Sequence, residues 1–317
     1  TDLLEILPGE TEKHAHLDLS ALLESHPAAE GKAQYCQVEG NAPFDKGVLA
    51  EKMIAEMLPA IEAGTGGDYY FNVSNCDRSI GARISGEIAR RYGNLSMEHH
   101  PVKVNLTGTA GQSLGVWNAG GLHIKLEGDA NDYVGKGMAG GRISIFPPKG
   151  SPFQTQNTAI IGNTCLYGAT GGKLFAAGTA GERFAVRNSG AFAVIEGAGD
   201  HCCEYMTGGI VTVLGKVGHN FGAGMTGGFA YVLDLDNDFV DRYNHELIEL
   251  NRISTEAMEE HKAFLGRILD EHIAETGSAW AYKIRHEFDF YSRKFWLVKP
   301  KAANLQTLLK TTQADPQ

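Results

Sequence analysis

The amino-acid sequence predicts a mainly β fold, a parallel β-helix (a solenoid) with α-helices on its flanks. Glycine accounts for forty of the 317 residues, about 13% against a usual frequency of about 7%, and most of these glycines lie between residues 101 and 240. In the same region, pairs of apolar residues two positions apart recur at steps of 19, 31, 19, 18 and 19 residues. Such a repeat is typical of stacked coils, and it predicts about 19 residues per coil.

Each apolar pair would direct two aliphatic side chains into the interior, because residues two apart in a strand face the same way. The expected inward ladder consists of Ile124, Leu126, Ile143, Ile145, Leu174, Ala176, Ala193, Ile195, Val211, Val213, Ala230 and Val232. The residues between the members of each pair are Lys125, Ser144, Phe175, Val194, Thr212 and Tyr231. This second row is too apolar for a solvated face, so either the flanks of the chain or a partner should cover part of it.

Glycines recur where each coil would turn. A corner that needs a positive φ angle or a close backbone approach favours a residue without Cβ. The predicted corner glycines are Gly108, Gly111, Gly115, Gly128, Gly135, Gly140, Gly215, Gly218, Gly222 and Gly227. The repeat predicts roughly seven coils, and the single long step, which contains Pro147, Pro148 and Pro152, predicts an insertion or an additional short turn.

Composition divides the chain into three expected parts: a flank over residues 1–100 that packs on the solenoid, the glycine-rich region 101–239 and a helical extension over 240–317. The first flank is expected to contain helices at 47–64 and 79–92 and a strand at 68–73. In the last part, apolar residues at helical spacing predict a long helix over about 240–276 and a further helix over 288–295.

Charge and cysteine usage bear on partners and compartment. The formal net charge of −10 disfavours nucleic acid and anionic membrane surfaces as partners. The chain has no apolar run long enough to span a membrane and no signal peptide in its first thirty residues. Five cysteines form an odd set that indicates reduced thiols, so we expect a cytoplasmic location.

Several local motifs invite a chemical interpretation, and in each the structural alternative is stronger. The stretches GKGMAG (135–140) and GAGMTG (222–227) match a dinucleotide-binding pattern, but each leads into a further expected strand rather than a helix. Residues 200–204 (DHCCE) lack a second pair of ligands at zinc-like spacing. His99 with His100, and Cys36, are expected to lie in loops. We therefore predict no metal, cofactor-binding or catalytic residue.

Some β-helices cleave polysaccharides with carboxylates on neighbouring coils. The candidates here are Asp129, Asp132, Asp200, Glu204, Asp234 and Asp236. Three of them fall at corners rather than in register on a strand, which disfavours this class. A stand-alone binding or carbohydrate-active protein remains the alternative function.

Five stretches carry a more specific resemblance: residues 75–83 (NCDRSIGAR), 108–113 (GTAGQS), 128–137 (GDANDYVGKG), 203–209 (CEYMTGG) and 294–300 (KFWLVKP). They resemble the C-terminal GXGXG domain of the large (alpha) subunit of bacterial NADPH-dependent glutamate synthase, and the likeness covers essentially the whole chain. A subunit of formylmethanofuran dehydrogenase is similar in fold type, so an assembly module of another oxidoreductase is a second alternative.

The resemblance implies a right-handed β-helix within an enzyme that converts glutamine and 2-oxoglutarate to two glutamates. It implies FMN and a 3Fe-4S cluster in another domain of the large subunit, and FAD, 4Fe-4S clusters and NADPH on the small subunit. No catalytic residue of that family maps onto this sequence. We therefore expect a non-catalytic structural domain whose partners are the other domains of the large subunit. Contact with the small flavoprotein subunit is left open.

Overall fold

The computed structural model describes residues 18–33, 35–40 and 47–309. Contacts between residues divide the chain into two compact units, Thr1–Asp45 and Lys46–Gln317. In the smaller unit the described elements are the short helix α2 (Ser20–Leu23) and the 3-10 turn η1 (Pro27–Ala29). The compositional boundaries expected near residues 100 and 239 both lie inside the larger unit.

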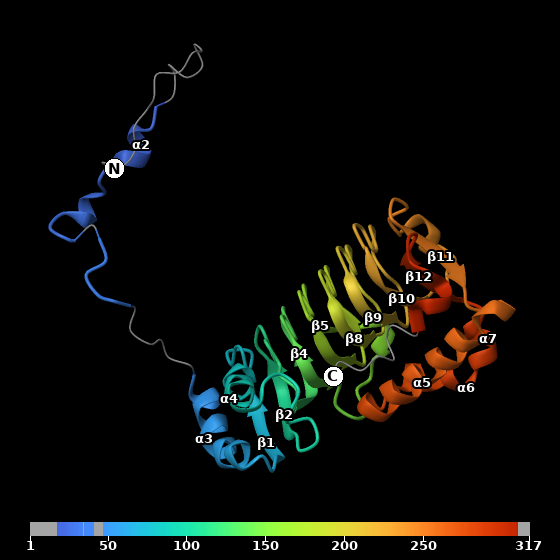
Figure 1. Cartoon of the computed structure of the whole chain (residues 1–317), viewed down its shortest axis with the longest axis horizontal. Coiled ribbons are helices and arrows are strands. Elements are labelled where there is room, and N and C mark those ends of the chain that lie inside the picture. The colour runs from blue at the N-terminus through green and yellow to red at the C-terminus, as the bar shows by residue number, and fades with distance from the viewer. Residues whose placement is uncertain (1–17, 34, 41–46, 310–317) are drawn as a thin grey trace. The chain divides into compact units, whose positions relative to one another are not determined.

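The larger unit is organised around a twelve-stranded sheet (Figure 1). Along the sheet the order is β1-β2-β3-β4-β6-β8-β9-β10-β12-β11, and the short β5 and β7 extend from β3. The strands are β1 (Gly67–Val73), β2 (Val102–Ala110), β3 (Leu122–Ala130), β4 (Ala139–Phe146), β5 (Ala159–Ile161), β6 (Gly171–Ala176), β7 (Thr179–Ala180), β8 (Ser189–Ile195), β9 (Thr207–Val213), β10 (Gly227–Leu233), β11 (Ile248–Arg252) and β12 (Phe295–Pro300).

Helices flank this sheet near both ends of the larger unit. They are α3 (Val48–Ala63), α4 (Ala82–Tyr92), α5 (Glu259–Thr276), α6 (Ala279–His286) and α7 (Phe288–Ser292). The 3-10 turns are η2 (Thr155–Asn157), η3 (Phe239–Asp241), η4 (Glu256–Met258) and η5 (Leu305–Thr307). Both α3 and α5 end at a glycine in the left-handed conformation, Gly64 and Gly277, which is a common way to terminate a helix.

The prediction of a mainly β, right-handed parallel β-helix of about seven coils is wrong. The sheet is mixed, because β12 pairs antiparallel with both β10 and β11, and helix and strand are about equally represented, at 27% and 28%. Two local predictions also fail in part: residues 248–252 of the helix expected over 240–276 form a strand, and the helix expected over 288–295 ends at Ser292, before the strand that begins at Phe295. Apolar spacing over so few residues does not distinguish a buried strand from a helix.

The strands from β1 to β10 nevertheless pair in parallel, in steps that follow the repeat. Ile124 of β3 lies beside Ile143 of β4, which lies beside Leu174 of β6. The same row continues through Ala193 and Val211 to Ala230. A second row contains Leu126, Ile145 and Ala176, and then Ile195, Val213 and Val232. All twelve residues are at most 1% exposed, and burying a Val, Leu or Ile side chain contributes about 1.5–3 kcal/mol.

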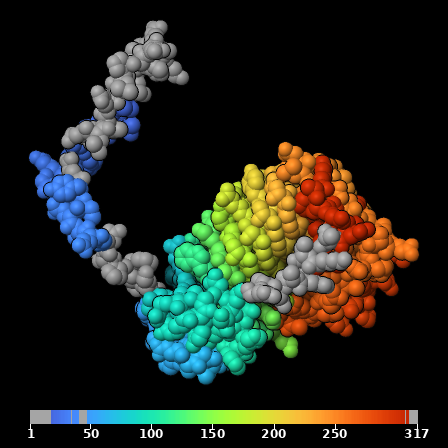
Figure 2. All heavy atoms as spheres, in the orientation of Figure 1, coloured from blue at the N-terminus to red at the C-terminus, as the bar shows by residue number. Residues whose placement is uncertain are grey.

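The side chains between the members of each apolar pair lie on the other face of these strands, and the C-terminal part of the chain covers this row. Phe175, Val194 and Tyr231 belong to a second buried cluster that includes Leu269 of α5 and Ile284 of α6. Figure 1 shows α5 and α6 beside the sheet, and Figure 2 shows the segments as successive bands from α3 and α4 to the C-terminal elements. Of the two covers left open by the sequence, a flank of the chain is the one observed.

Ion pairs hold α5 at the edge of this second cluster. Arg142 of β4 bonds to Glu275 of α5, Lys173 of β6 pairs with Glu271 at 2.7 Å, and Lys125 lies 3.9 Å from Glu275. These three cations come from neighbouring strands, so α5 follows a basic row that the sheet itself assembles. The row explains why Lys125 breaks the apolar pattern.

The loops between the strands form a third feature, which we call the turn row: residues 113–117, 133–137, 164–168, 183–187, 201–205 and 220–224. In every one of these loops the first, third and fifth residues have a positive φ angle. The third residue donates its N–H to the preceding loop, as Gly135 does to Leu114 at 2.9 Å. The first and fifth donate to the next loop, as Trp117 does to Lys136 at 2.8 Å. Many of these positions carry residues other than glycine, so the bonds between loops must offset the cost of the left-handed conformation.

The ten predicted corner glycines lie in three settings. Gly108, Gly128, Gly140 and Gly227 are strand residues, Gly115, Gly135 and Gly222 belong to the turn row, and Gly111, Gly215 and Gly218 follow strands. At all ten a Cβ would come within 3.0 Å of another atom. At Gly128, where φ is +149°, it would strike the carbonyl of Gly108, and at Gly227 it would strike that of Thr207. These two glycines allow neighbouring strands to approach closely.

Replacement of Gly128 by alanine should lower the free energy of unfolding by about 2–4 kcal/mol, because the backbone of Gly108 leaves no room for a methyl group. The matched control is Gly86→Ala in the exposed middle of α4, where nothing lies within 4 Å of the added Cβ. That variant should gain about 0.5–1 kcal/mol from helix propensity. Chemical denaturation measures both, and equal effects would contradict the close-approach interpretation.

Stability should also decrease as the pH falls from about 6.5 towards 4. Burial lowers the pKa of His123 on β3 to about 4, and the positive charge of Arg142 is the second largest cause. Lys103 and Lys125 lower this pKa further, while the negative charge of Glu275 raises it. The unfolded chain therefore binds a proton that the folded chain does not, and the loss should be about 1–2 kcal/mol after allowance for partial solvent screening.

A His123→Gln variant tests this pH dependence, with the exposed His219→Gln as its control. Denaturation at pH 7 and pH 5 should show a smaller loss in His123→Gln than in the unsubstituted chain, and an unchanged loss in His219→Gln. An unchanged loss in both variants would exclude His123 as the source.

Candidate functional site

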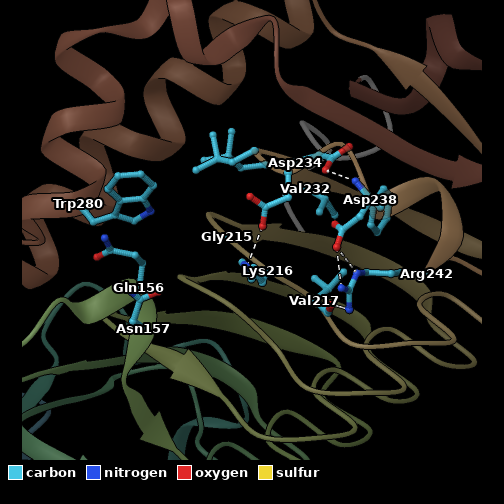
Figure 3. A pocket seen from close by; sticks show the side chains of 14 residues that line it. Gln156, Asn157, Gly215, Lys216, Val217, Val232, Asp234, Asp238, Arg242 and Trp280 are labelled. Carbon is cyan, nitrogen blue, oxygen red and sulfur yellow. Dashed lines mark hydrogen bonds and ion pairs between the residues drawn. The ribbon is translucent and has the colours of Figure 1, made fainter.

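The best-formed cavity that the described residues enclose lies beyond the end of β10, with a volume of about 220 Å³. Its apolar base includes Val217 and Val232, and Gln156 with Trp280 stands on the far side (Figure 3). The long step in the repeat supplies Gln156 through η2, and α6 supplies Trp280. Three parts of the chain that are far apart in sequence therefore build the cavity.

The charged residues of this cavity are paired with one another. Lys216 contacts Asp236 at 2.8 Å, and Asp238 accepts two hydrogen bonds from Arg242, at 3.0 and 2.6 Å. The Arg242 guanidinium lowers the pKa of Asp238 below its usual range, so this carboxyl is not poised to transfer a proton near neutrality. Arg242 also donates to the carbonyl of Val217. The cations that could hold an anionic substrate are thus engaged in closing the loop 234–242.

The remaining polar groups of the cavity join it to other elements. Asp234 accepts hydrogen bonds from the indole of Trp296 at 2.9 Å and from the backbone of Asp238 at 3.1 Å. The indole of Trp280 donates to the carbonyl of Leu214 at 2.6 Å. These contacts link β10 to β12 and β9 to α6. The cavity is a junction between layers, and each of its charged side chains holds a structural partner.

The densest cluster of potential ligands, residues 200–204, forms a polar network on the turn row. His201 lies 2.8 Å from Glu204, which also accepts a hydrogen bond from Asn220 at 3.1 Å. Cys202 and Cys203 are buried, with their sulfur atoms 3.7 Å apart, and burial raises the pKa of the Cys202 thiol well above its ordinary value. Neither thiol is a reactive nucleophile.

Within the part of the chain that the structure describes, no group of three or more His, Cys, Asp or Glu residues could hold a metal ion. The described cysteines are among the residues that form no such group: Cys165, Cys202 and Cys203 are buried, and Cys36 and Cys76 are exposed.

The six carboxylates considered for glycoside chemistry are each occupied by structural contacts. Asp129 accepts from Thr109 at 2.6 Å, and Asp132 and Asp200 each cap a backbone N–H of the next loop at 2.7 Å. Glu204, Asp234 and Asp236 hold the partners described above. Asp234 and Asp236 are the two of this set that line the cavity described above.

The other sequence candidates also lie in structural settings. Both glycine hexapeptides lie at the turn row and run into the strands β4 and β10 rather than into a helix, so no helix N-terminus faces a phosphate site there. His99 and His100 are exposed just before β2, and Cys36 is exposed in the smaller unit.

One buried polar set escaped the sequence analysis. Glu196 follows β8, His272 lies in α5, and Ser278 is the residue that caps α6, where it accepts from the N–H of Ala281 at 3.0 Å. Ser278 donates to Glu196, and His272 lies 3.5 Å from the same carboxylate oxygen. Glu196 and His272 are fully buried and Ser278 is 3% exposed, so no substrate reaches this Ser/His/Glu set. An acidic residue immediately after the apolar run 191–195 was the available signal.

Replacement of Ser278 by alanine should lower the free energy of unfolding by about 2–4 kcal/mol, because it removes a helix cap and leaves a buried carboxylate without its donor. Ser254→Ala, at an exposed position, is the control and should change stability by less than about 0.5 kcal/mol. Thermal or chemical denaturation distinguishes the two. Equal small effects would show that Glu196 does not depend on Ser278.

No helix in the described part of the chain is long and apolar enough to cross a membrane.

Comparison with known proteins connects this geometry to a family. The chain is 50% identical over 274 residues to ferredoxin-dependent glutamate synthase of Pyropia yezoensis, which covers 86% of this chain and 17% of that protein. It is 44% identical to the glutamate synthase [NADPH] large chain of Azospirillum brasilense, in a match that covers 95% of this chain and 20% of that protein. It is 46% identical to ferredoxin-dependent glutamate synthase 2 of Synechocystis, in a match that covers 95% of this chain and 19% of that protein.

The chain therefore spans about a fifth of the length of the curated relatives it matches. The resemblance noted in the sequence is confirmed, and it extends to the ferredoxin-dependent enzymes as well as the NADPH-dependent ones. Residues 50–301 match the GXGXG motif family. This match covers most of the larger unit, from α3 to the end of β12, and the chain belongs to the GXGXG motif family.

Proposed function

We propose that this chain is a non-catalytic structural and assembly domain of a glutamate synthase, the enzyme that converts glutamine and 2-oxoglutarate to two glutamates. The observation that carries the proposal is the pairing of its polar groups with one another. Every carboxylate considered for catalysis holds a structural contact, whereas the similarity to glutamate synthases extends over most of the chain.

The proposed role is to hold the glutamine amidotransferase domain and the FMN and iron–sulfur synthase domain of the same large chain in a constant relative position. Ammonia that passes between two active sites would be lost if the domains drifted apart, and fixed geometry preserves its high effective concentration. A sheet whose strands and turns are bonded in series, with α5 and α6 packed on one face, is suited to resist such drift.

The proposal assigns no cofactor to this chain. FMN and the 3Fe-4S cluster would be held elsewhere in the large subunit, and FAD, 4Fe-4S clusters and NADPH by the small subunit where one is present. Contact between the C-terminal elements and that small subunit, and a cytoplasmic location, belong to the same proposal.

The test is glutamate formation by a glutamate synthase large chain that lacks this segment, measured with and without the 317-residue chain added separately. We expect loss of glutamine-dependent glutamate formation on removal and at least partial recovery on addition, with glutaminase activity retained. Ammonia released per glutamine consumed should rise in the truncated enzyme, because the two active sites are no longer held together.

The Gly128→Ala variant of the added chain serves as control for folding, because it should rescue less in proportion to its lower stability. Full activity of the truncated enzyme, with ammonia release unchanged, would reject the bracing role. Turnover or ligand binding by the isolated chain would favour the alternative of a self-sufficient protein.

A further inference from the structure

A strip of exposed aromatic and basic side chains runs along the turn row. Trp117 is 65% exposed, Tyr205 56% and Tyr133 37%. Trp117 and Tyr205 are each the fifth residue of their loop, and Tyr133 is the first residue of its loop. The half-buried Lys136 shares the loop of Tyr133, and the exposed Arg183 and Arg187 belong to loop 183–187, which precedes the loop of Tyr205. We call these six residues the aromatic-basic strip. It crosses five successive loops, and strands about 4.8 Å apart make it about 19 Å long.

The turn row holds the aromatic rings in defined positions. The Trp117 ring lies over Gly137, where an added Cβ would come within 2.7 Å of it, and the Tyr205 ring lies in the same way over Gly224. Each ring therefore rests on the backbone of the next loop, at a site that any larger residue would block. Hydrogen bonds fix those backbones, such as that from Tyr205 to Ala223 at 2.8 Å. A surface fixed before binding loses little entropy when it is covered.

The strip is also basic in a chain whose formal charge is −10. Among the described residues Arg187 forms no ion pair, and Lys136 lies over the Tyr133 ring at 5.4 Å instead of beside a carboxylate. Arg183 shares Glu204 with His201, at 3.9 Å. The charge of the six strip residues is therefore positive and lies between aromatic residues, a combination that is enriched in the centres of protein interfaces. The exposed Glu182 beside Arg183 forms no ion pair among the described residues and is the negative charge next to the strip.

Two large apolar surfaces of the larger unit are covered by other parts of the chain. The apolar row of the sheet packs against α5 and α6, and Met57 of α3 and Ile84 of α4 join the core beside β1. Trp117 and Tyr205 of the turn row stay more than half exposed, as do Tyr70, Tyr282 and Phe290 elsewhere in the larger unit. Trp117 and Tyr205 contribute nothing to the core at those positions, so their exposure calls for another explanation.

We propose that the aromatic-basic strip is the surface on which another domain of the glutamate synthase large chain docks, through an acidic segment that also presents apolar groups. This inference rests on the proposed function and names the face that performs it. About four fifths of each matched relative lies outside the region shared with this chain, which supplies the occupant. The charge of the strip selects an acidic segment, and its rings select apolar groups within it.

The first experiment places a photo-crosslinking amino acid at position 117 or 205 of the full-length large chain, with position 282 as control. Tyr282 is 61% exposed on α6, across the sheet from the turn row. We expect irradiation at 117 and 205 to yield crosslinked peptides that are rich in Asp and Glu and lie outside this segment, and irradiation at 282 to yield none of the same peptides. Crosslinks at 117 and 205 only within this segment, only to a second copy of it, or to the same peptides as from 282 would overturn the proposal.

The second experiment adds Arg187→Glu and Trp117→Ser variants of the separate chain to the truncated enzyme. The exposed Arg293→Glu, which has the same charge change and forms no ion pair in the described residues, is the matched control. Circular dichroism and denaturation should show that all three remain folded. We expect the concentration needed for half-maximal rescue to rise at least tenfold for the two strip variants and to stay within twofold for Arg293→Glu.

These outcomes separate the docking surface from the proposed function. If the strip variants rescue activity as well as the unsubstituted chain does, the strip is not the docking surface, and the bracing role stays intact. Absence of rescue by the unsubstituted chain, with full activity of the truncated enzyme, would reject both. An acidic peptide from the crosslinked region should also bind the chain less tightly at 0.5 M salt than at 0.05 M, because the strip acts partly through charge.

Discussion

The rest of the structure depends on the hydrogen bonds that join each loop of the turn row to the next. Alternating left-handed and right-handed residues aim N–H groups in both directions along the row, so Gly135 bonds backward to Leu114 while Trp117 bonds forward to Lys136. These bonds set where each strand begins. The strand register follows, and it brings the aliphatic ladder to one face. Because a slip of one residue would turn that ladder outward, register and core stabilise each other.

Charged side chains join the C-terminal helices to the sheet. The sheet assembles Lys125, Arg142 and Lys173 into a basic row, and Glu271 and Glu275 of α5 dock on it. Deeper in the same layer, Glu196 receives a hydrogen bond from the cap of α6. Such pairs restrict how the helices sit on the sheet, since a charge left alone in a buried layer would be costly. In the described part of this layer, the charged groups therefore join the helices to the sheet.

The two sides of the repeat differ in how far other parts of the chain cover them. On one side the sheet is sealed by the C-terminal helices, and Phe175 and Tyr231 are fully buried there. Along the turn row the described residues leave Trp117 and Tyr205 largely exposed, although their rings are held against neighbouring glycines. The structural role that we propose needs both features, because one side must be stable by itself and the other must be able to bind the parts that it would position.

The sequence by itself determined the local elements of the repeat. The period and the alternation of apolar residues identified six strands, β3, β4, β6, β8, β9 and β10, and their ladder, because the two faces of a strand impose a period of two. Only the tertiary structure decided the fold class and the site. The short runs 248–252 and 295–300 become antiparallel strands because β10 offers an edge and α5 a cover, which local spacing cannot reveal. The pairing of Glu196 with Ser278, and of Lys216 with Asp236, likewise depends on which segments the closed sheet brings together.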